Sequence, residues 1–314
     1  MKRLLPPLGF AAAAIVAFAA MTAALPADAG HVRAPADALD VALGDGGPAL
    51  PDSDGDLAGY SSELPLPTLP PLVAPEPPPA PTQRPASLVL RVPVLMYHYI
   101  SAVPAEQASN RYAVDLRVPA DLFDQHLAYL RSQGYTSVTA PALWEALNGR
   151  AGLPPKPVML TFDDGYADAY TDALPLLLRY GFRGTFFITV NLIARPGYLN
   201  WDQVRALDRA GMDVESHAMD HKPMTGFSLS GLAYQMGEAR KALAKQLGRD
   251  VRFFAYPSGD YNATAVQAVA SNGYYAAFAK SGGSLQSLDW AFALHRSRVG
   301  GYAGVDGLQV ALGR

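Results

Sequence analysis

Strand-like and helix-like segments alternate through roughly 220 residues of this chain, and this alternation limits its fold more than any other feature. Apolar and β-branched runs predict strands at 88–97, 158–162, 184–190, 212–216, 252–256 and 274–279. Amphipathic segments predict helices at 119–131, 169–180, 201–210, 229–247 and 263–270. Such alternation means parallel strands joined by helical crossovers, so the sequence predicts an α/β domain, either a barrel or a doubly wound sheet.

Polar residues follow several of the predicted strands at the points where those strands end. His98, the pair Asp163 and Asp164, and His217 each come after a strand, as does the turn at 256–260. In parallel α/β folds the carboxyl ends of the strands meet on one rim, where binding and catalytic residues gather. We therefore expect one active site that combines these residues.

The segment Thr161-Phe162-Asp163-Asp164-Gly165 places two carboxylates side by side. Within a strand they would point to opposite faces, but at a strand end that runs into a glycine turn both can reach one cavity. A divalent cation would neutralise their mutual repulsion. On its own, the segment fits an ordinary Asp-Gly turn equally well.

A pair of histidines, His217 and His221, follows the predicted strand at 212–216 at a spacing of four. Two imidazoles and one carboxylate suit zinc or another first-row divalent metal and leave positions for water. The chain contains no cysteine, which excludes thiolate ligands, disulfides and a cysteine nucleophile. The alternative is a pair of solvent-exposed loop histidines.

Two further motifs, the turn at 253–260 and His98, indicate a function only in combination with the aspartate and histidine pairs. Residues 253–260 predict a strand that leads into a sharp turn, where a backbone N–H such as that of Tyr256 would hold an oxyanion. His98 ends the apolar run Val-Leu-Met-Tyr-His, a position where histidine is often structural. Hydrolysis of an amide, however, needs an acid for the leaving amine, and His98 is a candidate.

Taken together, residues 92–299 resemble the polysaccharide deacetylases with a NodB-type domain, which form carbohydrate esterase family 4. The resemblance rests on Thr-Phe-Asp-Asp-Gly followed, in that order, by the His-x-x-x-His pair. It implies a NodB-like distorted (β/α) barrel of about seven strands with one divalent metal, Zn²⁺ being favoured. It also implies that Asp164, His217 and His221 are the metal ligands and that Asp163 is the general base.

The acid is the point at which the sequence departs most from the common family pattern, where a histidine lies near the C-terminus. The early Met-Tyr-His98 segment resembles a circularly permuted branch that includes exported deacetylases of poly-β-1,6-N-acetylglucosamine. That resemblance implies that His98 is the acid, with His295 as the rival. Arg296 next to His295 would disfavour a protonated imidazole there if the two side chains are close.

Two other departures concern the third motif. The family often has an arginine just before the Tyr-Pro element, where it steadies the base, but this chain has Ala255. Arg252, Arg296 or Arg298 can take that role, and the sequence does not choose among them. Ser258 stands where the family often has a tyrosine, a change we expect to affect substrate preference.

The chain before the predicted catalytic domain at 88–314 has a different character. Residues 1–29 combine Lys2 and Arg3, an apolar run and an Ala-Asp-Ala site, which predicts a cleaved signal peptide, with an uncleaved anchor as the alternative. Residues 30–87 are acidic and rich in proline, which predicts an extended linker without a core. We therefore expect a periplasmic or extracellular protein.

These observations predict a metal-dependent hydrolase that removes N-acetyl groups from an N-acetylglucosamine-containing polysaccharide and releases acetate. In this prediction Asp163 takes a proton from water, the Tyr256 backbone N–H holds the oxyanion, and His98 protonates the amine. A formal net charge of −3 does not suggest nucleic acid as a partner, and we expect a monomer without a stable membrane partner. A glycosidase and a non-catalytic glycan-binding barrel are the alternatives.

Overall fold

Parallel strands form the centre of the protein in the computed structural model, which describes residues 88–301 and 303–313. Seven of them follow the order β10-β2-β4-β5-β6-β7-β8. Their bounds are β2 Val94–Tyr97, β4 Pro157–Phe162, β5 Gly184–Ile188, β6 Asp213–Ser216, β7 Phe253–Ala255, β8 Ala276–Phe278 and β10 Ser297–Arg298. A short β3, Thr136–Ser137, also pairs with β4. The predicted signal peptide at 1–29 and linker at 30–87 lie outside the described residues.

The sheet curls until its two edges are joined by one segment, residues 294–298. Leu294 forms a parallel bridge with Phe278 of β8, and the chain then continues into β10, which pairs with β2. We call residues 294–298 the seam segment. The distorted barrel of seven strands that the sequence predicts is therefore confirmed.

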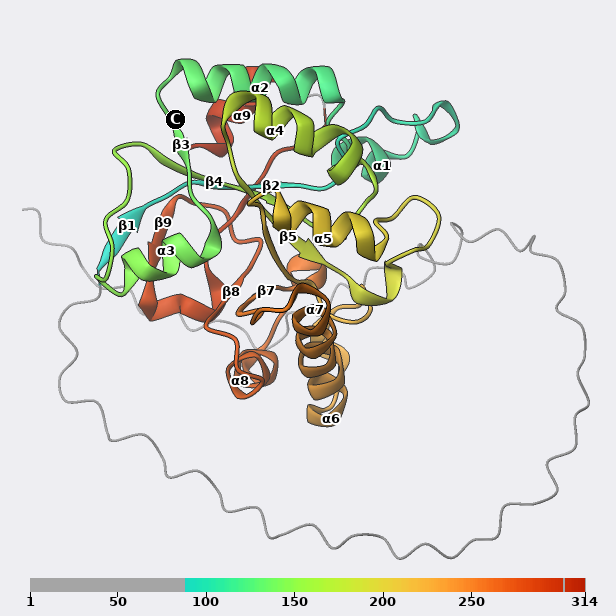
Figure 1. Ribbon diagram of the computed structural model, residues 1–314, viewed down its shortest axis with the longest axis vertical. Helices are drawn as coiled ribbons and strands as arrows, with labels where there is room; N and C mark the ends of the chain where they lie inside the picture. Colours follow the sequence, from blue (N-terminus) through green and yellow to red (C-terminus); the bar gives the residue numbers. More distant parts are fainter. Residues whose placement is uncertain (1–87, 302, 314) are drawn as a thin grey trace, which may run out of the picture. The chain divides into compact units, whose positions relative to one another are not determined.

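Helices surround the curled sheet (Figure 1). Those that cover its outer face include α2, α4 and α9, which lie together on one side, and α5, α7 and α8. The bounds of the helices are α1 Arg111–Leu116, α2 Ala120–Ser132, α3 Ala140–Leu147, α4 Leu174–Tyr180, α5 Trp201–Arg209, α6 Leu229–Leu232, α7 Ala239–Leu247, α8 Ala263–Ser271 and α9 Gly304–Ala311. Among the described residues, no helix is both long and apolar enough to span a membrane.

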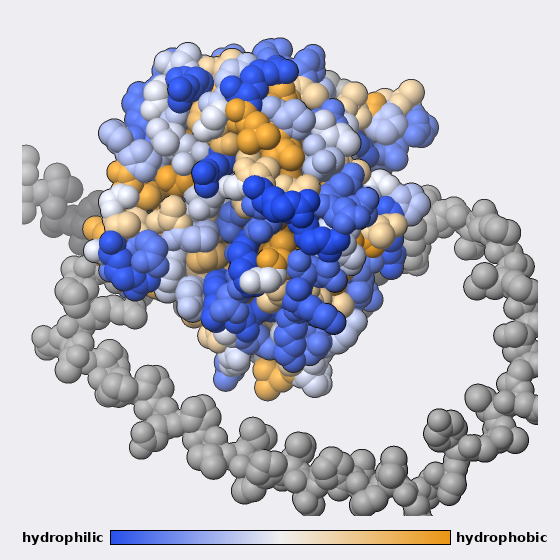
Figure 2. Space-filling model, in the orientation of Figure 1, coloured by the Kyte–Doolittle hydropathy of each residue, from blue (hydrophilic) through white to orange (hydrophobic). Residues whose placement is uncertain are grey.

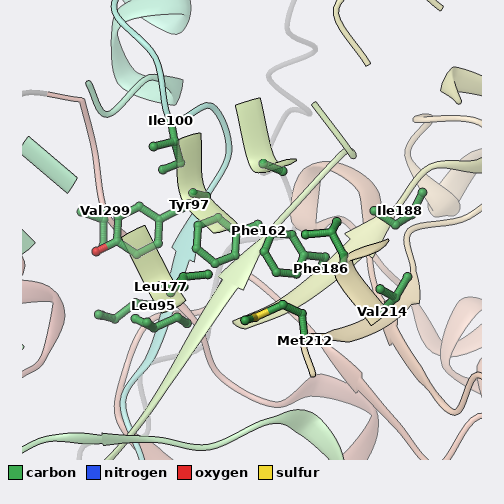
Figure 3. Close-up of a cluster of buried hydrophobic side chains, with 14 of the residues drawn as sticks. Leu95, Tyr97, Ile100, Phe162, Leu177, Phe186, Ile188, Met212, Val214 and Val299 are labelled. Atoms are coloured by element: carbon green, nitrogen blue, oxygen red, sulfur yellow. The ribbon is translucent and has the colours of Figure 1, made fainter. Parts of the chain in front are cut away.

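Alternation along the strands divides the core into two layers. The outer layer lies between sheet and helices, where Tyr97, Phe162 and Phe186 stack in sequence with ring centroids 5.6 and 4.6 Å apart (Figure 3). The inner layer fills the barrel and contains Met159 and Phe187. At the carboxyl ends of the strands, the positions that face the barrel interior are occupied by polar residues, which can form a site.

Three predicted elements differ from the structure. The helix predicted at 169–180 begins with a π-helical stretch, Ala169–Ala173, before α4. The single strand predicted at 88–97 is two strands, because Pro93 cannot donate a ladder hydrogen bond. The first, β1 Val89–Arg91, pairs antiparallel with β9 Leu285–Ser287 outside the barrel. The helix predicted at 229–247 is continuous but contains a π-helical stretch at Ala233–Glu238 between α6 and α7.

Candidate active site

The turn after β4 brings two carboxylates to the same rim. Asp163 and Asp164 follow the strand directly, and Asp164 has a backbone φ of 75°, a conformation that few non-glycine residues adopt. Gly165 continues the turn with φ 88°. Because Asp164 has a left-handed backbone conformation, the side chains of Asp163 and Asp164 leave the strand end in different directions. Backbone strain of this kind is typical of functional sites.

Asp164 meets the two predicted histidines in a compact cluster. The Nε2 atoms of His217 and His221 each lie 3.2 Å from Asp164 Oδ1. Potential ligand atoms of the three residues all lie within 4.8 Å of one another. The three side chains that the sequence analysis assigned to a metal are therefore together at the carboxyl ends of β4 and β6.

The donor atoms in this cluster fit a cation. His217 Nδ1 lies 2.8 Å from the Ala255 carbonyl oxygen, which can only accept, so Nδ1 carries the proton of the neutral ring. The lone pair of His217 Nε2 therefore faces Asp164 Oδ1, a buried atom with no hydrogen-bond partner within 88–301 and 303–313. Electron pairs facing each other in a buried site require a cation or an extra proton between them.

The loop between the two histidines is held by a residue that the sequence analysis missed. Gln235, which is 2% exposed in the π-helical stretch, accepts hydrogen bonds from the backbone N–H groups of Met219 and Asp220 and donates to the Asp220 carboxylate. Asn191 donates to the other Asp220 oxygen at 2.8 Å. π-Helical turns often occur at functional sites, but the helical periodicity of the sequence does not reveal them.

Asp163 faces a different partner. Arg296 of the seam segment donates two hydrogen bonds to its carboxylate, from Nη1 to Oδ1 at 2.7 Å and from Nη2 to Oδ2 at 2.8 Å. Burial alone would raise the pKa of Asp163, but the guanidinium overcomes this effect and holds that pKa below its usual value. Asp163 is consequently held as an anion in one orientation.

Arg296 is the arginine that supports Asp163, a role for which the sequence offered three candidates. Its Nε donates to the Ala279 carbonyl, and its side chain is 1% exposed. The other two candidates lie elsewhere: Arg252 pairs with Asp250, and Arg298 pairs with Asp115 at 2.6 Å. Among these three arginines, Arg296 alone contacts Asp163.

The two candidate acids have different surroundings. His98 follows β2 and is close enough to Asp164 and Asp163 for both carboxylates to act on its titration. Burial lowers the pKa of His98 to about 4, although both carboxylates act in the opposite direction. His295, in contrast, stacks on Trp290 with ring centroids 5.4 Å apart. Because Arg296 points into the barrel, strand alternation turns the preceding His295 away from it.

The structure corrects the expectation for Tyr256. Its backbone N–H donates to the Phe278 carbonyl at 3.1 Å, and its hydroxyl donates to the Phe292 carbonyl at 3.0 Å. Both donors are committed to β8 and its neighbourhood, so the Tyr256 N–H is not available to an oxyanion. Sequence reasoning identified the turn but had no means of seeing the partner of this N–H.

Stacked rings form a wall near the rim. Tyr99 and Tyr166 stack with centroids 3.4 Å apart, Tyr198 lies 5.0 Å from Tyr166, and the Arg117 guanidinium covers the Tyr99 ring at 3.6 Å. Burial raises the pKa of Tyr99, Tyr166 and Tyr198, and the negative charge of nearby Asp164 adds to this effect in each, so all three rings lie near the cluster. No motif in the sequence indicated this wall.

Comparisons with known proteins agree with this geometry. Residues 150–277 match the polysaccharide deacetylase family. The Bacillus subtilis protein YxkH, which carries the name of a polysaccharide deacetylase, is 31% identical over 218 residues, 69% of this chain and 73% of that protein. The Escherichia coli poly-beta-1,6-N-acetyl-D-glucosamine N-deacetylase is 28% identical over an alignment of 189 residues that covers 52% of this chain and 28% of that protein.

A solved structure extends the similarity to the whole barrel. The Streptococcus pyogenes deacetylase PplD in complex with acetate superposes with a TM-score of 0.66 at 28% identity, covering 72% of this chain and 99% of that chain. Fold, rim geometry and sequence therefore lead to one assignment. The chain belongs to the polysaccharide deacetylase family and is an enzyme of that class.

Proposed function

We propose that this protein is a metal-dependent hydrolase that removes N-acetyl groups from an N-acetylglucosamine-containing polysaccharide outside the cytoplasm. The observation that carries the proposal is the pair of 3.2 Å contacts from His217 and His221 to the unpartnered Asp164 Oδ1. Two imidazoles and one carboxylate with open positions are typical of catalytic zinc. When bound there, the ion would polarise the acetyl carbonyl and lower the pKa of a water molecule.

Asp163 is the base in this proposal. It lies next to a metal ligand, and Arg296 keeps it ionised and oriented, so it can accept a proton from the attacking water. The reaction adds water to the amide, breaks the C–N bond and yields acetate and a free sugar amine. The proton that Asp163 takes from water is thus the one that the leaving nitrogen requires.

His98 is the proposed route of that proton to the amine. Since burial lowers its pKa to about 4, the ring is neutral in the resting protein near pH 7. A neutral ring cannot serve as an acid until it has been protonated, so His98 receives its proton during turnover and passes it to nitrogen as the C–N bond breaks. The role of His98 as the acid is thus kept, with its proton taken up during turnover.

The nature and location of the substrate rest on separate support. The Escherichia coli relative is named for poly-beta-1,6-N-acetyl-D-glucosamine, which favours a polymer of N-acetylglucosamine. The pattern at 1–29 is that of an exported protein, which agrees with an envelope or extracellular polysaccharide. The tyrosine wall offers ring faces near the metal ligands, a surface suited to sugar rings.

An acetate-release assay tests the proposal. The chelated protein is incubated with poly-β-1,6-N-acetylglucosamine, peptidoglycan and chitin oligosaccharides, with and without added Zn²⁺, and both acetate and new reducing ends are measured. We expect acetate from at least the first polymer, dependent on the metal, without new reducing ends. Reducing ends without acetate would indicate a glycosidase, and binding without either product would indicate a glycan-binding barrel.

A further inference from the structure

A second hollow lies away from the metal ligands, on the side of the barrel. It has a volume of about 520 Å³ and is lined by Trp144, Asn148, Val266, Tyr275 and residues 288–293. We call it the aromatic groove. Tyr275 directly precedes β8, whereas the proposed metal ligands follow β4 and β6, so the Tyr275 wall of the groove lies at the other end of the parallel strands from the metal site.

Aromatic rings dominate the walls of the groove. Trp144 stacks on Tyr275 with centroids 5.5 Å apart and planes at 23°, and Tyr275 is 43% exposed. Trp290 forms another part of the lining. The groove therefore presents flat apolar faces. An occupant with apolar rings would match them.

The course of the chain places such an occupant beside the groove. β1 pairs antiparallel with β9, with Val89 opposite Ser287. Because the strands are antiparallel, residues before 89 are directed along the course of residues after 287, and those residues line the groove. Leu88 and Val89 are 47% and 49% exposed, and Figure 2 shows apolar atoms on the flank where β1 lies.

We propose that residues 77–87, Pro-Pro-Pro-Ala-Pro-Thr-Gln-Arg-Pro-Ala-Ser, bind in the aromatic groove of their own catalytic domain. Proline-rich segments favour the polyproline II conformation and dock into aromatic-lined grooves at a low entropy cost. At 3.1 Å per residue, eleven such residues span about 34 Å, enough to follow the groove from the start of β1. A proline ring suits the aromatic faces of the groove lining, to which Trp144 and Trp290 contribute.

Fluorine NMR of the full chain labelled with 5-fluorotryptophan tests this inference. The chain has three tryptophans: Trp144 and Trp290 line the groove, and Trp201 begins α5 as an internal reference. One variant replaces the five prolines of 77–87 by serine. The matched control replaces five upstream prolines instead, namely Pro65, Pro67, Pro70, Pro71 and Pro75.

We expect the Trp144 and Trp290 resonances to move in the 77–87 variant and to stay unchanged in the upstream control, with Trp201 unchanged in both. A synthetic peptide of residues 77–87 should return both resonances to their wild-type positions in the variant and have no effect on the wild type. Unchanged Trp144 and Trp290 resonances in the 77–87 variant would overturn the proposal. So would a variant in which chitin oligosaccharides, and not the peptide, move those signals.

Discussion

Arg296 and Asp163 form a buried bidentate ion pair across 133 positions of sequence, with N–O distances of 2.7 and 2.8 Å. The pair joins the seam segment to the rim of β4. We predict that Arg296→Gln lowers kcat and costs about 3–5 kcal/mol of stability, because it leaves a buried carboxylate without its partner. Arg298→Gln is the control: its pair with Asp115 is partly exposed, so it should cost about 0–1 kcal/mol.

Urea unfolding and acetate release, measured on both arginine variants, decide this prediction. Metal content should stay unchanged in each, because neither arginine contacts the three proposed ligands. Equal losses of stability and of rate in the two variants would mean that the ion pair has no special role.

Metal binding can be tested through His217, which is 1% exposed and fixed by its bond to the Ala255 carbonyl. We predict that His217→Ala loses bound zinc and acetate release together, because one of the three proposed ligands is gone. His295→Ala is the matched control and should retain both. Elemental analysis after dialysis against a weak chelator gives the occupancy. A fully loaded and active His217→Ala protein would exclude this histidine as a ligand.

Asp163 should behave differently from its neighbour Asp164. We predict that Asp163→Asn keeps the metal but loses about 10²–10⁴-fold in kcat, since a base is removed and a ligand is not. Asp164→Asn should instead weaken metal binding. If Asp163→Asn loses its metal and regains appreciable activity when zinc is restored, the two roles are exchanged.

The two histidines considered for proton delivery provide another paired test. We predict that His98→Ala loses most of kcat at saturating metal, whereas His295→Ala stays within a few-fold of wild type, because His295 stacks on Trp290. A substrate with an activated leaving group, such as an acetanilide, should recover rate in His98→Ala, since its amine needs less protonation. Loss of activity in His295→Ala alone would return the acid to the C-terminal end.

The buried ring of His126 in α2 should make the stability of the protein depend on pH, independently of the active site. Its ring is fully buried between the Tyr97 hydroxyl and the Gly304 carbonyl, and burial lowers the pKa of His126 to about 4. The unfolded chain, with a histidine pKa near 6.5, binds this proton more readily. The stability that the neutral His126 ring contributes is therefore fully present above pH 6.5 and is lost as pH falls towards 4. At pH 5 we expect the free energy of unfolding to be lower by about 2 kcal/mol.

Urea unfolding of wild type and His126→Gln between pH 7.5 and pH 5 measures this effect. Glutamine keeps a donor for Gly304 but does not titrate, so the difference in stability between the two proteins should shrink as pH falls. A difference that stays constant over this range would show that His126 titrates normally in the folded protein.

Local patterns in the sequence were sufficient for β2 and for β4 to β8, and for grouping the three proposed metal ligands, but not for the short β3, β9 and β10. Asp164, His217 and His221 each follow a strand whose apolar run is legible, and parallel topology brings such ends together. Arg296 was one of three candidates because its contact with Asp163 depends on how the sheet closes. The partner of the Tyr256 N–H was hidden for the same reason, since it lies in β8 and not in the motif. The role of Gln235 depends on a π-helical turn that helical periodicity conceals.

The seam segment also has a consequence for the order in which the parts of the site are synthesised. A nascent chain emerges amino terminus first, so the aspartate pair and both histidines are made long before residues 294–298. Until the seam segment arrives, Asp163 has no countercharge and the sheet has an open edge. The pairing that holds Asp163 as an anion is therefore possible only after a residue 133 positions later in the chain has been made.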